Sequence, residues 1–383
     1  MISYKEEYNE KNRCFNLSSY SLVNFIQENF PDYKVEVIDY ETIDDFLIKI
    51  KIILKSNSLL KLIGNFRMIK RFHHDLWKHL PLSKKRVVSD KANVLSMNFD
   101  GVYDAIVVGS DAIWNDIEKT SKLNYFLVDF KHCKKFSYAA STSGLDLNKL
   151  EDNSRRRCLK NALRDFSYIG VRESKAENFI HKVDDSLICY HNCDPTCFIK
   201  LDKINIDLKN RFLKYGIDDR PIVCLMTGNE QVGKHVYDEF HKTHQIMALY
   251  VYNSYADRVL YDISPMEFAV IFRYVDILFS YFFHGCYLCL KNATPVIAVD
   301  GYSEKNGEKT KIKDLFDRLG IGDWYFRTAD MTEEDYKLML KKAHTLINNS
   351  QSSFIESRLI EEEKYNRSFI DTMKKLMMPK GNE

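Results

Sequence analysis

Polar side chains that could act on a substrate follow an apolar run that ends at Val108. The run Ile106–Val108 has the composition of a buried strand. It precedes five candidate site residues: Gly109, Ser110, Asp111, Trp114 and Asn115. Ligands of open α/β sheets bind at the carboxyl ends of strands, so we expect Ser110 to contact a substrate and Asp111 to act as a base or to contact a substrate hydroxyl. The alternative is that Asp111 and Asn115 only cap the following turn.

The next apolar run also ends in hydroxyl groups. Phe136–Ala140 is followed by Ser141 and Ser143. Two neighbouring strands that end in this way would line one polar crevice, so we predict that both serines contact the same substrate as Ser110. The alternative is an ordinary loop, because small polar residues are also common between elements.

An arginine and a histidine stand where an anion could bind. Arg172 follows a predicted strand and precedes a helix, so it could bind a carboxylate or phosphate through two hydrogen bonds. Its alternative role is a surface pair with Glu173. His284 opens a helix after the apolar run 276–280, beside unpaired backbone amides, where it could act as a general acid or contact a phosphate. A structural histidine is the alternative. The candidates that flank His284 are Ser280 and Gly285.

Alternating strands and helices are expected to position these residues. The predicted strands of the first half are 35–39, 105–108, 135–140, 168–171 and 187–190. They alternate with helical patterns over 150–166 and 174–183, which predicts a parallel sheet covered by helices. A second alternating series begins at 221–226, after a charged stretch over 200–214. The sequence therefore predicts an α/β fold of two Rossmann-like domains, followed by C-terminal helices that can pack back across both. The predicted bounds are 1–200, 215–330 and 331–383.

Composition and charge exclude several classes of protein. The chain has 383 residues, of which 45% are hydrophobic and 29% charged, and this excludes a fibrous or disordered chain. The net charge of +2 argues against a nucleic-acid partner, since no overall positive field is present. No run of about 18 apolar residues predicts a membrane span. Nine cysteines, an odd number, and no leader-like N-terminal run predict reduced thiols and a cytoplasmic protein.

The cysteines do not have the spacing of a zinc site. Cys189, Cys193 and Cys197 surround a predicted strand and a proline turn, and Cys286 and Cys289 lie on one predicted helix. Neither group contains the paired knuckles of zinc-binding sequences. We therefore expect buried thiols and no metal.

The segment 58–86 is strongly basic. It contains eight Lys or Arg residues and one acidic residue, Asp75, with apolar residues near helical spacing. It could make a peripheral contact with the inner face of the cell membrane. The alternative is a helix packed on the first sheet with its basic face in solvent.

Five segments of the chain occur in the order and spacing of one known family. They are Val108–Asn115, Phe136–Ser141, Ile169–Glu173, Cys193–Thr196, and Ser280–Gly285 together with Pro295–Ala298. In these segments the chain resembles the polysaccharide pyruvyl transferase family, over roughly residues 1–320. The resemblance rests on the five segments together, because no single one is diagnostic.

The resemblance implies a fold and a reaction. It implies two Rossmann-like domains that face a cleft, as in the sugar-nucleotide glycosyltransferases of the two-Rossmann type. The donor would be phosphoenolpyruvate, whose pyruvyl group becomes a ketal on two hydroxyls of a sugar or lipid-linked oligosaccharide during cell-surface polysaccharide synthesis. No cofactor would be required. His284 would be the general acid or a phosphate contact, Arg172 would bind the donor's carboxylate or phosphate, and Asp111 would contact the acceptor or act as a base.

The chain departs from the family pattern in two places. Phe282 stands where many relatives have an arginine, so Lys291 or Lys309 could supply the missing donor contact. Relatives usually have an Asn-x-Gly turn after their first strand, whereas residues 2–12 contain no glycine. Two other functions are compatible with the same architecture: a nucleotide-sugar-dependent glycosyltransferase, and a noncatalytic partner in glycan assembly.

Overall fold

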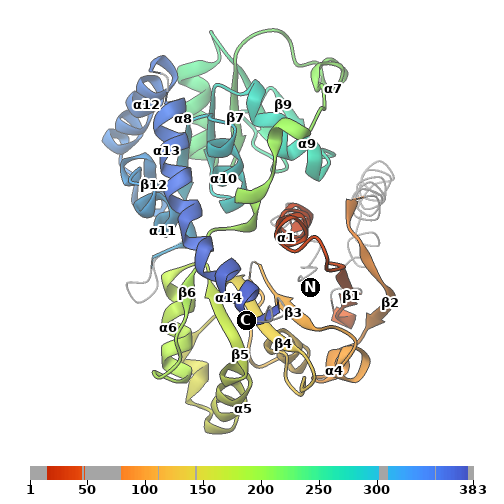
Figure 1. Cartoon of the computed structure of the whole chain (residues 1–383). Helices are drawn as coiled ribbons and strands as arrows, with labels where there is room; N and C mark the ends of the chain where they lie inside the picture. Colours follow the sequence, from red (N-terminus) through yellow and green to blue (C-terminus); the bar gives the residue numbers. More distant parts are fainter. Residues whose placement is uncertain are drawn as a thin grey trace.

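The computed structural model describes residues 15–44, 47, 79–110, 112–142, 145–301, 309–349 and 351–377. Figure 1 shows two groups of parallel strands flanked by helices. Two candidate site residues, Asp111 and Ser143, lie outside the described residues, and so does the part of the basic segment over 58–78. What we inferred about them from the sequence stays a prediction.

A four-stranded parallel sheet of order β3-β4-β5-β6 forms the core of the N-terminal half. Its strands are β3 (Ala105–Val108), β4 (Lys134–Ala140), β5 (Phe166–Val171) and β6 (Tyr190–His191). The accompanying helices are α4 (Val94–Phe99), α5 (Asn153–Arg164) and α6 (Ser174–Val183). Helix α5 begins at a side-chain cap, because Asp152 accepts hydrogen bonds from the next backbone amides. Helices α5 and α6 both contact β5, and α6 buries residues of helical spacing on one face.

A separate two-stranded sheet lies beside this core. It pairs β1 (Val37–Glu41) with β2 (Leu82–Val88) in parallel. The last residues of the basic segment 58–86 therefore form a strand. We had predicted a helical pattern for the whole segment, and for these residues that prediction is wrong. Ser83 and Val87 are buried on β2 while Lys84 to Arg86 are largely exposed. Pairing with β1 decides the structure here, as is common for short segments with mixed propensity.

A six-stranded parallel sheet forms the C-terminal half, with the order β12-β11-β10-β7-β8-β9. Its strands are β7 (Ile222–Met226), β8 (Gln245–Leu249), β9 (Arg258–Leu260), β10 (Ile277–Ser280), β11 (Val296–Asp300) and β12 (Tyr325–Arg327). Its helices are α8 (Glu230–Phe240), α9 (Pro265–Val270), α10 (Phe283–Lys291) and α11 (Lys311–Arg318). The chain first moves outward from β7 to β9 and then returns to β7 as β10. The strand order thus reverses between β7 and β10, where Met226 pairs with Ser280. Ligands of open α/β sheets bind at such a reversal.

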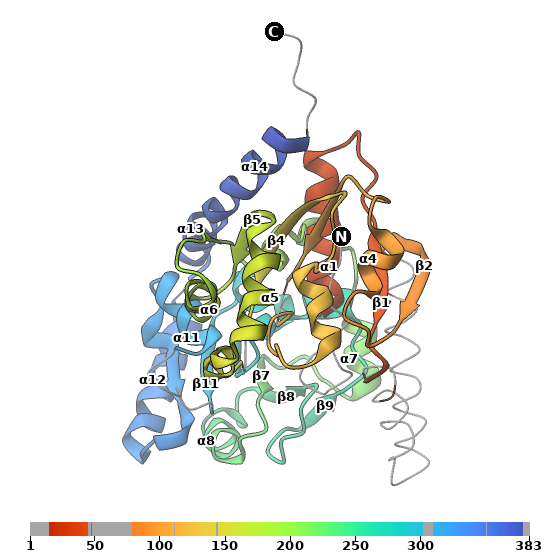
Figure 2. The ribbon, with the colours of Figure 1, turned by 90° about the horizontal axis from the view of Figure 1, so that it is seen from below.

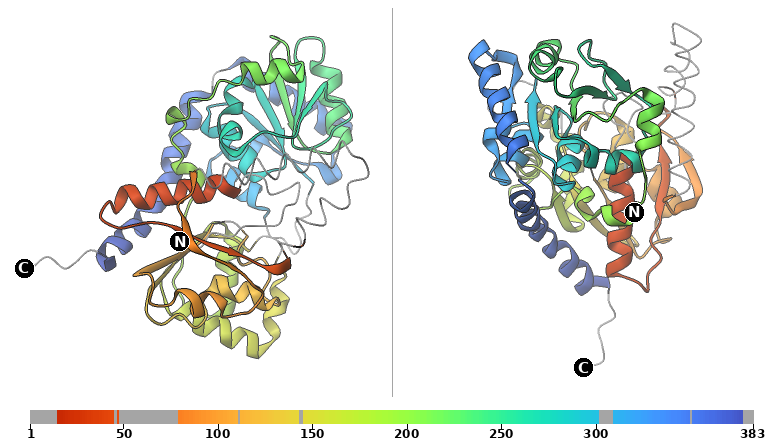
Figure 3. Two further views of the ribbon diagram at one scale, coloured as in Figure 1. Left: turned by 90° about the vertical axis from the view of Figure 1, so that its right-hand side faces the viewer. Right: turned by 90° about the horizontal axis from the view of Figure 1, so that it is seen from above.

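Two segments from the ends of the chain connect the halves. The C-terminal helices are α12 (Glu333–Asn348), α13 (Ser352–Glu363) and α14 (Arg367–Met377). Helix α12 contacts α8, α13 contacts α10, and α14 reaches β5, so these helices run from one sheet to the other (Figure 2). Helix α1 (Phe15–Asn29) contacts both α9 and the turn Pro195–Phe198 (Figure 3).

The predicted fold class is confirmed: the protein is α/β, with parallel sheets and a helical C-terminal segment. The domain bounds near residues 200 and 215 stay a prediction. Among the helices that the structure describes, none has the length and apolar character to cross a membrane.

Candidate functional site

Arg172 lies at the carboxyl end of β5 and is buried, with 1% of its surface exposed. Its Nη1 donates a hydrogen bond to Asp194 Oδ2 at 2.8 Å, and its Nε lies 3.5 Å from Glu173 Oε2. The guanidinium carbon lies 4.7 Å from the centre of the Phe283 ring. This environment rules out the surface pair with Glu173 that the sequence left open.

Asp194 lies at the centre of the site, although we did not predict it as a site residue. Its Oδ1 accepts hydrogen bonds from the backbone N (3.0 Å) and from Oγ1 (2.7 Å) of Thr196. Through these bonds Asp194 caps the short helix that starts at Pro195. Burial alone would raise the pKa of Asp194. The charges of His284 and Arg172 and the hydrogen bonds from Thr196 nevertheless hold it below its ordinary value of 3.8. Asp194 is therefore a carboxylate at neutral pH.

His284 lies in the first turn of α10, just after the strand reversal. Its Nδ1 lies 3.6 Å from Asp194 Oδ1, and the residue is 8% exposed. The first amides of a helix are not used within the helix and create a positive potential. An acid–base group therefore lies beside a helix end that favours anions. We call these three residues the Arg172–Asp194–His284 cluster; they come from β5, from the connection between the sheets and from α10.

Glu173 joins the loops that follow β4 and β5. Its Oε1 accepts hydrogen bonds from Ser141 Oγ at 2.7 Å and from the backbone N of Thr142 at 2.9 Å. All three residues are buried. Ser141, which we predicted as a substrate contact, is thus held by Glu173 at the edge of the cluster, and Glu173 is a second residue that the sequence analysis missed.

Gly109 is required by the packing of β3 against β4. Its φ is +142°, and a Cβ atom at this position would lie 2.0 Å from the backbone oxygen of Tyr138. Next to it, Ser110 is buried, and its Oγ has no hydrogen-bond partner among the residues that the structure describes. Of these two candidates, Ser110 is the one whose side chain retains an unused polar atom.

Trp114 is part of the core. It is fully buried, its Nε1 donates to the backbone oxygen of Tyr125 at 3.1 Å, and its ring stacks on Phe126 at 5.2 Å between centroids. The structure gives it a packing role in place of the substrate contact that we predicted. Asn115 lies in the same turn, half-buried, with its backbone N bonded to the oxygen of Ala112.

Ser280 and Gly285 shape the turn between β10 and α10. Ser280 Oγ accepts a hydrogen bond from the backbone N of Phe282 at 2.9 Å. A Cβ atom on Gly285 would lie 2.9 Å from Met226 Sδ and 3.2 Å from Ser280 Oγ. Both residues therefore allow α10 to start close to the strand reversal, which places His284 there.

Lys291 lies at the opposite end of α10 from His284. Seven residues of α-helix separate them, or roughly 10 Å along the axis. Lys291 bonds to the backbone oxygen of Cys197 and lies 3.5 Å from Glu363 Oε1. It lines a pocket of about 440 Å³ together with Phe25, Glu28, Cys197, Phe198, Ile199, Lys200, Leu201, Asp202 and Glu363. The structure therefore does not bring Lys291 to the cluster. Lys309 lies 2.9 Å from Asp317 Oδ2.

Comparisons with known proteins place the chain in a family and a fold. The profile of the family described as polysaccharide pyruvyl transferase matches residues 16–302. No curated protein sequence matches the chain significantly.

Two solved structures are similar. One is a UDP-GlcNAc 2-epimerase from Neisseria meningitidis bound to UDP-GlcNAc (TM-score 0.52, 11% identity, 98% of each chain covered). The other is described as a UDP-N-acetylglucosamine 2-epimerase from Listeria monocytogenes (TM-score 0.54, 11% identity, 98% of this chain and 95% of that chain covered). At this identity the likeness shows the fold alone, the two-Rossmann arrangement predicted from the sequence.

Proposed function

The chain belongs to the polysaccharide pyruvyl transferase family, and we propose that it transfers the pyruvyl group of phosphoenolpyruvate to two hydroxyls of a sugar as a ketal. The observation that carries this proposal is the Arg172–Asp194–His284 cluster. It combines an acid–base group, a buried carboxylate and a buried positive charge at the start of a helix. These are the groups that the reaction of an anionic enol phosphate requires.

The proposed reaction balances without a redox step. A proton added to C3 of phosphoenolpyruvate makes C2 electrophilic, and one sugar hydroxyl adds to C2 with loss of its proton. The bond between C2 and the phosphate oxygen then breaks, and the second hydroxyl adds to C2 and loses its proton. The two hydroxyls lose two protons in total. One balances the proton added to C3, which becomes part of the new methyl group, and the other leaves with the phosphate. The donor's carboxylate stays on C2 of the ketal.

The residues of the cluster have distinct roles in this proposal. Asp194 faces Nδ1 of His284, so we assign the proton transfer to C3 to the opposite nitrogen, Nε2. Arg172 is enclosed by Asp194 and Phe283, and it supplies positive potential next to the first turn of α10. We retain Asp111 as the candidate contact for the acceptor hydroxyl, together with Ser110 and Ser143.

We further propose that the acceptor is a sugar or lipid-linked oligosaccharide of a cell-surface polysaccharide. Family membership supports a polysaccharide substrate. We propose that the reaction takes place in the cytoplasm, where phosphoenolpyruvate and reduced thiols both occur.

Ligand-induced thermal stabilisation tests the donor. A ligand that binds only the folded protein raises its melting temperature. We expect phosphoenolpyruvate to raise it and UDP-sugars to leave it unchanged, and we expect His284→Ala and Arg172→Ala to abolish the effect. Lys291→Ala, at the far end of α10, is the matched control and should respond as the wild type does. Release of inorganic phosphate from phosphoenolpyruvate in the presence of candidate sugars then tests the transfer. A shift with UDP-sugars alone would instead support a nucleotide-sugar-dependent enzyme.

A further inference from the structure

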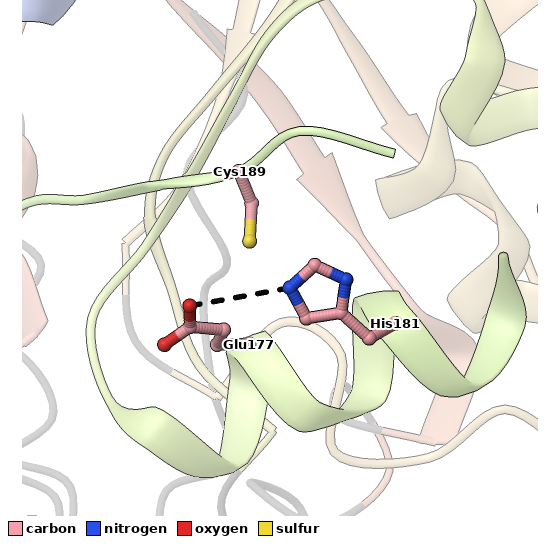
Figure 4. Close-up of side chains that lie close together, drawn as sticks. All are labelled: Glu177, His181 and Cys189. Carbon is pink, nitrogen blue, oxygen red and sulfur yellow. Dashed lines mark ion pairs between the residues drawn. The ribbon is translucent and has the colours of Figure 1, made fainter. Parts of the chain in front are cut away.

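Three side chains outside the cluster converge at the edge of the N-terminal sheet. Glu177, His181 and Cys189 each offer one atom that can bind a metal, and these atoms all lie within 4.8 Å of one another. Figure 4 shows the thiol of Cys189 directed into the space between the carboxylate and the imidazole. Within the part of the chain that the structure describes, this is the one group of three or more His, Cys, Asp or Glu side chains whose donor atoms all come this close.

The fold itself positions the three residues. Glu177 and His181 are four residues apart on α6, so they lie on the same face of the helix, with 4.0 Å between Oε1 and Nε2. Cys189 precedes β6, the edge strand that pairs with β5. It is half-buried, which corrects our expectation of a buried thiol, whereas Cys193 and Cys197 are buried as expected.

We propose that Glu177, His181 and Cys189 bind a zinc ion. Thiolate and imidazole are ligands of zinc and related transition metals, while Mg²⁺ and Ca²⁺ prefer sites made of oxygen atoms. Three protein ligands leave the fourth tetrahedral position to water. The site revises our expectation that no cysteine of this chain binds a metal.

The geometry requires only small movements. Zinc–ligand distances of about 2.0–2.3 Å place neighbouring ligand atoms of a tetrahedral site roughly 3.5 Å apart. The donor atoms of Glu177 and His181 are 4.0 Å apart and all three donor atoms lie within 4.8 Å of one another, and Glu177 is exposed and able to change its rotamer. Asp185 lies 3.7 Å from Nδ1 of His181, on the side of the ring away from Glu177. A carboxylate there is the partner that commonly orients a metal-bound histidine.

A metal at this position would act on the candidate active site through the backbone. Helix α6 starts two residues after Arg172, and Cys189 precedes Asp194 by five residues. Zinc would therefore tie the element that follows Arg172 to the strand that leads to Asp194. The proposed role is structural: it fixes the relative positions of these two residues.

Metal titration of the full-length protein tests this proposal independently of activity. We expect saturable Zn²⁺ binding at one site and a rise in melting temperature with Zn²⁺ but not with Mg²⁺. Co²⁺ as a spectroscopic probe should give a thiolate-to-metal charge-transfer band in the near ultraviolet. Cys189→Ser should remove the band, and both Cys189→Ser and His181→Ala should weaken binding about tenfold or more, because even indirect partners of a metal ligand contribute this much.

A second thiol provides the control. Cys158 on α5 is also half-buried, and Cys158→Ser should leave affinity and spectrum unchanged. Absence of saturable binding in the wild-type protein would overturn the proposal. Zinc binding that Cys189→Ser and His181→Ala leave intact would also overturn it, since the metal would then lie elsewhere.

Discussion

Replacement of Asp194 by Asn is the substitution that discriminates best between a structural and a functional reading of the cluster. The side chains have nearly the same shape, so Asn can still accept the hydrogen bonds of Thr196 through one oxygen. Its other terminal atom becomes a donor, which then faces the Arg172 guanidinium, itself a donor at 2.8 Å in the wild type. The substitution also removes the negative charge 3.6 Å from His284 Nδ1.

The expected loss of stability follows from burial. Removal of one partner from a buried ion pair destabilises a protein by about 3–5 kcal/mol, because the remaining charge stays buried. Glu173 Oε2 lies 3.5 Å from Arg172 Nε and continues to balance part of the charge. We therefore expect about 3 kcal/mol, the lower end of this range. Thr196→Val removes only the hydroxyl hydrogen bond to Asp194 and should cost about 1–2 kcal/mol.

Denaturant unfolding and the rate of pyruvyl transfer together measure the two effects. Loss of the carboxylate beside His284 should reduce this rate, because the group that faces Nδ1 of the imidazole is then changed. Asp184→Asn is the control, since Asp184 pairs with Lys160 and Arg164 at the far end of α6. It should leave the rate of pyruvyl transfer unchanged.

Two results would refute this reasoning. A loss of less than about 1 kcal/mol in Asp194→Asn would mean that the ion pair with Arg172 is not enclosed as the structure shows. An unchanged rate of pyruvyl transfer in a destabilised variant would mean that Asp194 does not act on His284.

Three further predictions concern other parts of the molecule. Gly109→Ala should destabilise the protein by about 3 kcal/mol or more in denaturant unfolding, because the new methyl group would meet the Tyr138 backbone at a φ that favours glycine. Lys291→Ala should lower stability by about 1 kcal/mol, through loss of its bond to Cys197, while calorimetry with phosphoenolpyruvate shows unchanged affinity. Burial raises the pKa of Glu362, but His191, whose Nε2 lies 3.6 Å from Oε1, and the charge and hydrogen bonds of Arg318 bring it below its ordinary 4.5. The unfolded state therefore binds more protons in acid, so the stabilisation is complete above about pH 4.5 and is lost as the pH falls further, and Glu362→Gln should flatten this acid limb of stability measured against pH.

Much of the fold could be predicted because strand ends have a local signature. The apolar run before Gly109 and the one before His284 were both predicted within a few residues of β3 and β10. Parallel strands are buried on both faces, which makes them continuous apolar runs that are visible in one sequence. The short, partly exposed edge strand β9 lacks this signature and was missed. Strand β2 was mistaken for helix because its pairing with β1 is a long-range contact.

The candidate site was less predictable, since tertiary contacts decide which polar residue serves chemistry. Trp114 and Arg172 both follow strand ends, yet one ring packs in the core while the other side chain meets Asp194. Asp194 itself lies outside any strand, in the segment Cys193–Thr196, which the sequence offered only as part of the family resemblance. Lys291 belongs to the same helix as His284, but the helical rise separates them. Each outcome depends on tertiary contacts that one sequence does not reveal.

The energetics of the cluster favour a functional explanation over a purely structural one. A buried ion pair costs desolvation energy that its attraction often only balances, so apolar residues of similar volume can hold a core equally well or better. The Arg172–Asp194 pair is buried, and the Arg172 guanidinium lies against the Phe283 ring. Stability alone therefore gives no reason for two charges at this place. Their geometry does give one, because the pair fixes a carboxylate beside the imidazole at the strand reversal, where an open α/β sheet binds its ligand.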